Sequence, residues 1–115
     1  MRRAAGGLVE QLTPTGLILG TFGGVAYSER TVALGPGDAV AVFTDGLTEV
    51  GGSRLEMLGV QGVAGLLERS ILPAEAGDAG SLAEHLVRGL MAGVDGAAKG
   101  GVTRDDVCLL VGVVE

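Results

Sequence analysis

Two uninterrupted apolar runs, one in the middle of the chain and one at its end, dominate the hydrophobic pattern. Ala39–Thr44 follows the turn signal Gly35-Pro36-Gly37-Asp38, and Val107–Val114 (VCLLVGVV) lies next to the C-terminus. A short continuous apolar run that is bounded by turn residues is typical of a strand buried inside a sheet. The pattern therefore predicts two central strands, one on each side of the middle of the chain.

The segment between these runs changes to a helical period. Apolar residues recur at three- and four-residue steps from Val60 to Ile71, and again from Leu82 to Val94. This spacing places the apolar side chains on one face of a helix. Ser81-Leu82-Ala83-Glu84 has the form of a capping box, and Asp95-Gly96 has the form of an exit turn. We expect two helices, near Val60–Ser70 and Leu82–Val94, packed on one face of a sheet.

The first third of the chain carries weaker strand signals. Leu8–Leu12 and Leu17–Leu19 are short apolar segments on either side of the turn signal Thr13-Pro14-Thr15-Gly16. Ser28–Leu34 alternates loosely and contains β-branched residues, as a half-buried strand does. The chain has 115 residues, which is enough for one domain with one core. We therefore expect three more short strands in the same domain.

Composition and charge exclude several classes of partner. The net charge is −6, and Arg2-Arg3 is the largest basic cluster, so neither nucleic acid nor an anionic membrane is an expected partner. The apolar stretch Gly16–Tyr27 is too short and too rich in glycine to span a membrane. Cys108 is the single cysteine, which excludes an internal disulfide and is typical of a reducing cytoplasm. We expect a cytoplasmic protein.

Acidic residues stand at the ends of both central runs. Asp45 follows the first run, and Asp105 and Asp106 precede the last one. If the two strands are antiparallel neighbours, these carboxylates meet at one edge of the sheet, where a hard divalent cation would relieve their repulsion. Gly46 would let backbone and metal-bound water approach closely. Two plainer interpretations stay open, because Asp-Gly is also a common turn and an acidic loop end also protects a sheet edge.

Three segments carry a resemblance to a known family. Leu34–Glu49 (LGPGDAVAVFTDGLTE) is similar to a strand and turn signature of the form L-x-P-G-D, an apolar run, and T-D-G-L-x-E. Thr103–Val111 (TRDDVCLLV) is similar to a terminal strand that begins with two aspartates, and Thr15–Gly20 resembles a G-x-P-L-G segment. In this order and spacing, they resemble the C-terminal half of a metal-dependent protein phosphatase (PPM) domain of the stage II sporulation E-like branch.

The resemblance implies a fold and a chemistry. The fold would be α+β, with antiparallel sheets flanked by helices as part of an α-β-β-α sandwich. Such enzymes hydrolyse phosphoserine or phosphothreonine with water activated by Mg or Mn, and they form no phosphoenzyme. Asp45 and Asp105 would be metal ligands in a site that holds two metals in the complete domain. Asp106 would hold the loop or contact a metal through water, and no catalytic residue beyond the ligands is implied.

Two parts of the family pattern are missing from this sequence. The early acidic motif, whose aspartate bridges both metals, has no counterpart, and the glycine-histidine segment is absent as well. We therefore expect residues 1–115 to be a truncated domain with little activity alone, completed by an N-terminal segment or a second chain. The expected partner is a phosphorylated regulatory protein of a sigma-factor or two-component pathway. The alternative is a non-catalytic module that binds such a regulator without dephosphorylating it.

Overall fold

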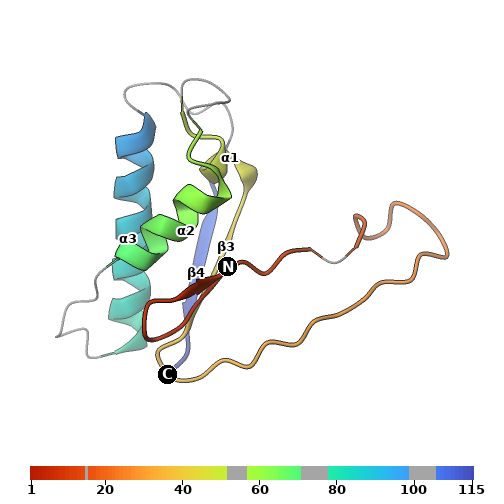
Figure 1. The fold of residues 1–115 in the computed structure, drawn as a ribbon, viewed down its shortest axis with the longest axis horizontal. Helices are drawn as coiled ribbons and strands as arrows, with labels where there is room; N and C mark the ends of the chain where they lie inside the picture. Colours follow the sequence, from red (N-terminus) through yellow and green to blue (C-terminus); the bar gives the residue numbers. More distant parts are fainter. Residues whose placement is uncertain (15, 52–56, 71–77, 99–105) are drawn as a thin grey trace.

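The computed structural model describes residues 1–14, 16–51, 57–70, 78–98 and 106–115, and these contain four strands and three helices. Figure 1 shows the helices gathered on one side of the sheet and a long two-limbed excursion on the other. In chain order the elements are β1 (Arg2–Arg3), β2 (Val9–Glu10), β3 (Ala39–Phe43), α1 (Asp45–Thr48), α2 (Gly59–Arg69), α3 (Ala79–Ala98) and β4 (Leu109–Val113).

The four strands form one antiparallel sheet in the order β2-β1-β3-β4. β3 and β4 pair along their whole length, from Ala39 opposite Val113 to Phe43 opposite Leu109. The prediction that the two central apolar runs are antiparallel neighbours is therefore confirmed, although each strand is slightly shorter than its run. The helices and this sheet together confirm the α+β fold class.

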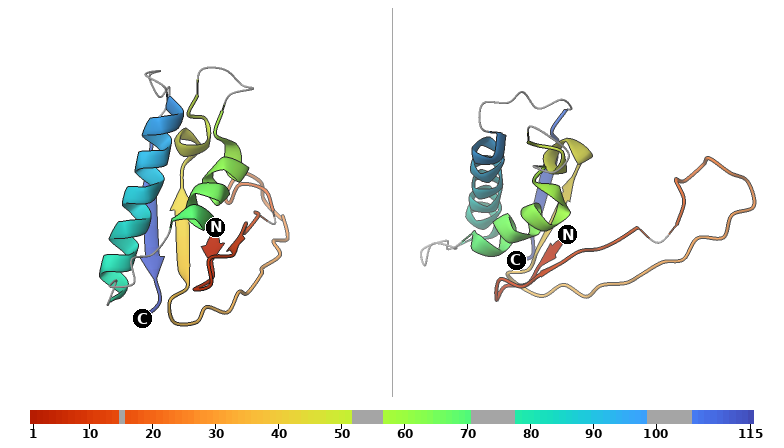
Figure 2. Two further views of the ribbon diagram at one scale, coloured as in Figure 1. Left: turned by 60° about the vertical axis from the view of Figure 1, so that its left-hand side comes forward. Right: turned by 45° about the horizontal axis from the view of Figure 1, so that its top comes forward.

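The core lies between the sheet and the helices. α3 packs on β4, and α2 packs on α3, as Figure 2 shows from two further directions. Ala39 and Ala41 of β3 face the helices and are buried. The next residue, Val42, points to the opposite face of the sheet and is 58% exposed. The predicted apolar stripe of α3 is confirmed, because all four of its members are buried: Leu82, Leu86, Leu90 and Val94. The described helices thus cover one face of the sheet.

The helix predicted near Val60–Ser70 is confirmed as α2, whereas α3 differs from the prediction at both ends. Asp78, not Ser81, caps α3: its carboxylate accepts the backbone N–H of Ser81 at 2.8 Å and the Ser81 hydroxyl at 3.1 Å. Asp78 thus accepts the Ser81 amide that a capping box would assign to Glu84, so the capping-box interpretation was wrong. The exit turn expected at Asp95-Gly96 was also wrong, since α3 continues to Ala98. Neither α3 nor any other helix in the described ranges is long and apolar enough to cross a membrane.

A buried arginine joins the sheet to the end of α2. Arg3 of β1 is only 5% exposed, and its Nε and Nη2 donate to the carbonyl oxygens of Leu67 and Ser70 at 3.0 and 3.2 Å. The last carbonyls of a helix have no partner inside the helix, so these hydrogen bonds satisfy groups that would otherwise be buried without one. The orientation of α2 on the sheet is fixed at this point.

The strand predictions for the first third of the chain were mostly wrong. Only Val9–Glu10 of the segment Leu8–Leu12 is a strand, and residues 17–19 and 28–34 belong to none. Residues 16–34, here called the arm, leave the body of the molecule (Figure 1). Strand formation needs a neighbouring strand that accepts the backbone hydrogen bonds. In the described part of the chain, the arm pairs with no strand of the sheet.

Candidate metal centre

The first predicted ligand, Asp45, lies at the point where β3 becomes α1. Thr44 is still extended (φ −81°, ψ 163°) and forms the N-cap, and Asp45 is the first residue of the helix. The Asp45 carbonyl accepts the Thr48 hydroxyl and the Glu49 backbone N–H, both at 2.9 Å. The backbone of Asp45 is therefore fixed, while the residue itself is exposed to solvent.

The short helix α1 is held by its apolar residues. Gly46 is buried and Leu47 is 0% exposed, so both lie against the core rather than at the surface. The Asp45 Oδ1 accepts the backbone N–H of Gly46 at 3.0 Å, which orients the carboxyl group relative to its own helix. The other carboxylate oxygen has no hydrogen bond to a described residue. Asp45 is thus an anchored acid with one oxygen available.

Thr44 brings the start of β4 to the end of β3. Its Oγ1 donates to the carbonyl oxygen of Asp106 and accepts the backbone N–H of Cys108, each at 3.0 Å. The Thr44 backbone N–H also donates to the Cys108 carbonyl at 3.1 Å. These contacts place Asp106 at the same end of the sheet as Asp45, as the acidic pattern predicts. Asp105, the second predicted ligand, lies outside the described residues.

Thr44 itself was missed as a positioning residue when the sequence was interpreted. The sequence places Thr44 in the T-D-G motif, and a β-branched residue with a hydroxyl is ordinary at a strand end. Its role depends on which strand lies beside it, and local sequence does not contain that information. The predicted pairing of the two central strands could have indicated this role. Thr44 is the first residue after one of the paired strands, where a side chain can form hydrogen bonds to the neighbouring strand.

The donor chemistry at this end of the sheet fits a hard divalent cation, although the number of donors is small. Asp45 and Asp106 are both exposed and offer carboxylate oxygens, which Mg²⁺ and Mn²⁺ prefer. Among the residues that the structure describes, no three His, Cys, Asp or Glu side chains come together as a group that could hold a metal ion. The described residues therefore fit part of a metal site and not a closed cage.

Asp38, at the opposite end of β3, has a different environment from Asp45. Its carboxylate accepts the backbone N–H of Gly35 at 3.1 Å and that of Ala5 at 3.0 Å, and it is paired with Arg2 at 2.8 Å. The hydrogen bond from Gly35, followed by those from Arg2 and Ala5, lowers the pKa of Asp38 to about 2. Its oxygens are occupied, so Asp38 fixes the turn before β3 and joins it to β1.

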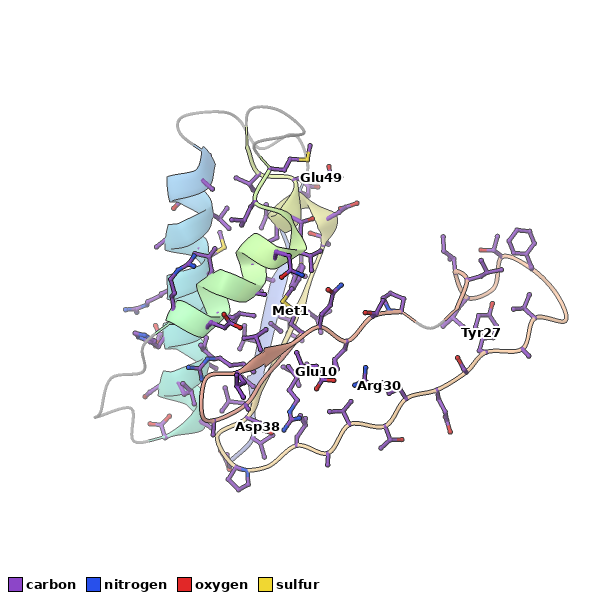
Figure 3. The ribbon with its side chains drawn as sticks, viewed as in Figure 1. Met1, Glu10, Tyr27, Arg30, Asp38 and Glu49 are labelled. Carbon is purple, nitrogen blue, oxygen red and sulfur yellow. The ribbon has the colours of Figure 1, made fainter. Side chains whose placement is uncertain are left out.

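The two acids of this motif, Asp38 and Asp45, lie at opposite ends of β3, and Figure 3 helps to locate these ends. Asp38 is labelled near the turn that precedes β3, and Glu49 is labelled beyond α1 at the far end. The motif from Leu34 to Glu49 thus has a structural acid at its beginning and an exposed acid, Asp45, near its end. Of these two acids, only Asp45 has a carboxylate oxygen without a hydrogen bond to a described residue.

Comparison with models of known protein families gives a match over nearly the whole chain. The model of the family described as stage II sporulation protein E (SpoIIE) matches residues 1–114, which is nearly the whole chain. No curated protein and no solved structure matches the chain. The matched range contains the Thr44-Asp45-Gly46 motif and Asp106. The chain belongs to the SpoIIE family and is a phosphatase-related domain.

Proposed function

We propose that this chain is the C-terminal part of a metal-dependent protein serine/threonine phosphatase domain, in which Asp45 and Asp105 bind Mg or Mn. The observation that carries the proposal is the Thr44 bridge, which joins the chain at Asp106 to the strand end that presents Asp45. Bound metal ions of this kind activate water for attack on phosphorus and neutralise the charge of the phosphate. The family match supports the same reaction class.

The residues of this chain have separate tasks in the proposal. Asp45 offers its exposed carboxylate from a backbone that α1 holds in place. Gly46 donates its backbone N–H to the Asp45 carboxylate and is buried, so the close approach of metal-bound water that its residue type suggested is not part of its task here. Thr44 sets the distance between the two acidic strand ends. Because the chain carries a net charge of −6, a phosphorylated substrate would be repelled without cations at this position. The site is therefore expected to work only with metal bound.

The substrate in this proposal is a phosphorylated regulatory protein of a sigma-factor or two-component pathway, in the cytoplasm. The early acidic motif of the family has no counterpart in these residues, so further carboxylates come from an N-terminal segment or a second chain. A second candidate function is a non-catalytic module that binds such a regulator. That candidate is favoured by one observation, which is that the described residues provide no group of three metal-binding side chains.

The test compares turnover before and after the missing motif is supplied. The 115-residue chain alone should hydrolyse neither a phosphoserine peptide nor p-nitrophenyl phosphate at a measurable rate with Mn²⁺. Fusion or addition of the N-terminal acidic segment of a SpoIIE-family phosphatase should restore Mn²⁺-dependent hydrolysis, and Asp45→Asn should abolish it again. Glu84→Gln is the matched control, because Glu84 is an exposed acid in the first half of α3, whose start lies beside Gly37 and Val113 at the opposite end of the sheet.

Three results would contradict parts of the proposal. Robust metal-dependent turnover by the chain alone would refute the claim that its metal site is incomplete. Activity of the completed protein that survives Asp45→Asn would refute the ligand assignment. A completed protein that binds the phosphorylated regulator without releasing phosphate would favour the binding module over the enzyme.

A further inference from the structure

The peptide group that joins Asp45 to Gly46 is held at both of its polar atoms. Its carbonyl oxygen, which belongs to Asp45, accepts the Thr48 hydroxyl and the Glu49 backbone N–H, both at 2.9 Å. Its N–H, which belongs to Gly46, donates to Oδ1 of Asp45 at 3.0 Å. A peptide group is planar and turns as one unit, so a contact that fixes its carbonyl also fixes the direction of its N–H.

The helix that contains this peptide group is too short to hold it firmly. α1 has four residues, and the first turn of a helix fixes several backbone angles for a single hydrogen bond. The side chain at an N-cap normally accepts an amide of the first turn, but the Thr44 hydroxyl bridges to Asp106 and Cys108 instead. The Asp45 carboxylate accepts the Gly46 amide in its place. The turn therefore depends on side chains of its own residues.

The Thr48 hydroxyl makes a contact that is common in helices, but here its acceptor belongs to a predicted metal ligand. A threonine hydroxyl often bonds to a carbonyl of the preceding turn, and such a bond has no function by itself. In this case the carbonyl and the N–H that holds the Asp45 carboxylate are parts of the same peptide group. A second donor on the carbonyl oxygen polarises that group and makes its N–H a stronger donor. The hold of Thr48 is thus passed on to the carboxylate.

We propose that Thr48 is a positioning residue for the metal site: through this peptide group, its hydroxyl keeps Oδ1 of Asp45 bound and Oδ2 available to a divalent metal ion. The inference rests on the proposed function, in which Asp45 binds Mg or Mn. Partners that orient a metal-binding side chain typically change metal affinity by about 10- to 100-fold when they are removed. Because Thr48 acts through a peptide group, we expect an effect at the lower end of this range, about 10-fold.

The test measures the Mn²⁺ affinity of the full 115-residue chain from the broadening of the Gly46 and Asp106 amide signals in nuclear magnetic resonance spectra. Thr48→Val removes the hydroxyl, keeps the shape of the side chain and should weaken Mn²⁺ binding about 10-fold. Thr48→Ser keeps the hydroxyl and should bind Mn²⁺ as the wild type does. Thr31→Val is the matched control, because Thr31 is an exposed threonine of the arm, and it should also bind as the wild type does.

Two further measurements separate positioning from a purely structural role. Hydrogen exchange at the Glu49 amide, which shares the Asp45 carbonyl with Thr48, should become faster in Thr48→Val, while the midpoint of urea unfolding stays that of the wild type, because this bond lies at the surface. In the completed protein, Thr48→Val should raise the Mn²⁺ concentration for half-maximal hydrolysis about 10-fold. The rate at saturating Mn²⁺ should change much less.

The outcomes distinguish this inference from the proposed function on which it rests. Faster exchange at the Glu49 amide with unchanged Mn²⁺ affinity would overturn the role of Thr48, because the hydroxyl would then hold only the turn. An equal loss of affinity in Thr48→Ser would overturn it too, since the hydroxyl would not be the cause. If Asp45→Asn abolishes Mn²⁺ binding and Thr48→Val does not weaken it, only the role of Thr48 fails. If Asp45→Asn binds Mn²⁺ as the wild type does, the ligand assignment fails as well.

Discussion

Leu86 gives the most direct test of how the helices stabilise the sheet. Its side chain is 0% exposed in the middle of the α3 stripe, so Leu86→Ala removes buried carbon atoms and leaves a cavity. Loss of three carbons corresponds to about 2.4 kcal/mol of transfer free energy, at about 0.8 kcal/mol for each. The cavity term adds about 1–2 kcal/mol if the site relaxes only in part. We expect the free energy of unfolding to fall by about 3–4 kcal/mol.

The assay is equilibrium unfolding in urea, followed by far-ultraviolet circular dichroism. With a slope of about 1.5 kcal/mol per molar urea, the loss corresponds to a midpoint that is lower by about 2 M. Leu8→Ala is the control, because Leu8 is 79% exposed and the same substitution there should change stability by less than about 0.5 kcal/mol. A loss below about 1 kcal/mol for Leu86→Ala would refute the packing of α3 on this sheet.

Substitutions at three other residues, Gly93, Thr44 and Asp38, test separate contacts. Gly93→Ala should lower the free energy of unfolding by about 1–3 kcal/mol, since its Cβ would lie 2.3 Å from a methyl group of Leu66. The control is Gly96→Ala on the same helix, whose Cβ would meet nothing within 4 Å and which should raise that free energy by about 0.5–1 kcal/mol. Equal effects of the two substitutions in thermal unfolding would contradict the close approach of α2 and α3. Thr44→Val should cost about 1 kcal/mol and speed hydrogen exchange at the Cys108 amide, and Thr44→Ser should do neither, because it keeps the bridging hydroxyl. Asp38 has its pKa lowered from 3.8 to about 2, so its charged form stabilises the fold above about pH 4, and that stabilisation is lost as the pH falls toward 2. Asp38→Asn should therefore be less stable than the wild type at pH 6 and converge with it near pH 2, and a constant difference in unfolding free energy across that range would disprove the assigned cause.

The elements that the sequence predicted well are those with a strong local signal. The apolar runs that became β3 and β4 and the stripe from Leu82 to Val94 owe their character to burial inside the molecule. Hydrophobic periodicity reports burial directly, so these elements and the pairing of two buried strands could be inferred. The location of Asp45 and Asp106 at the same end of the sheet could be inferred from the same pairing.

The errors arose where structure depends on a partner rather than on pattern. Residues 17–19 have a strand pattern, but a strand also needs a neighbour, and the sequence does not show whether one is present. The error at the cap of α3 was local: both Asp78 and Ser81 can cap a helix, and α3 begins at Ala79, directly after Asp78. The roles of Thr44 and Arg3 depend on contacts between segments about sixty residues apart, which no local signal records.

The central claim is that the end of the sheet formed by Asp45 and the start of β4 binds a divalent metal. The most direct measurement is the paramagnetic broadening of backbone amide signals in nuclear magnetic resonance spectra as Mn²⁺ is added to the full chain. The account predicts that Gly46 and Asp106 broaden first, that Ala39 next to the occupied Asp38 does not, and that Asp45→Asn removes the effect. Broadening that begins near Asp38, or that persists unchanged in Asp45→Asn, would contradict it.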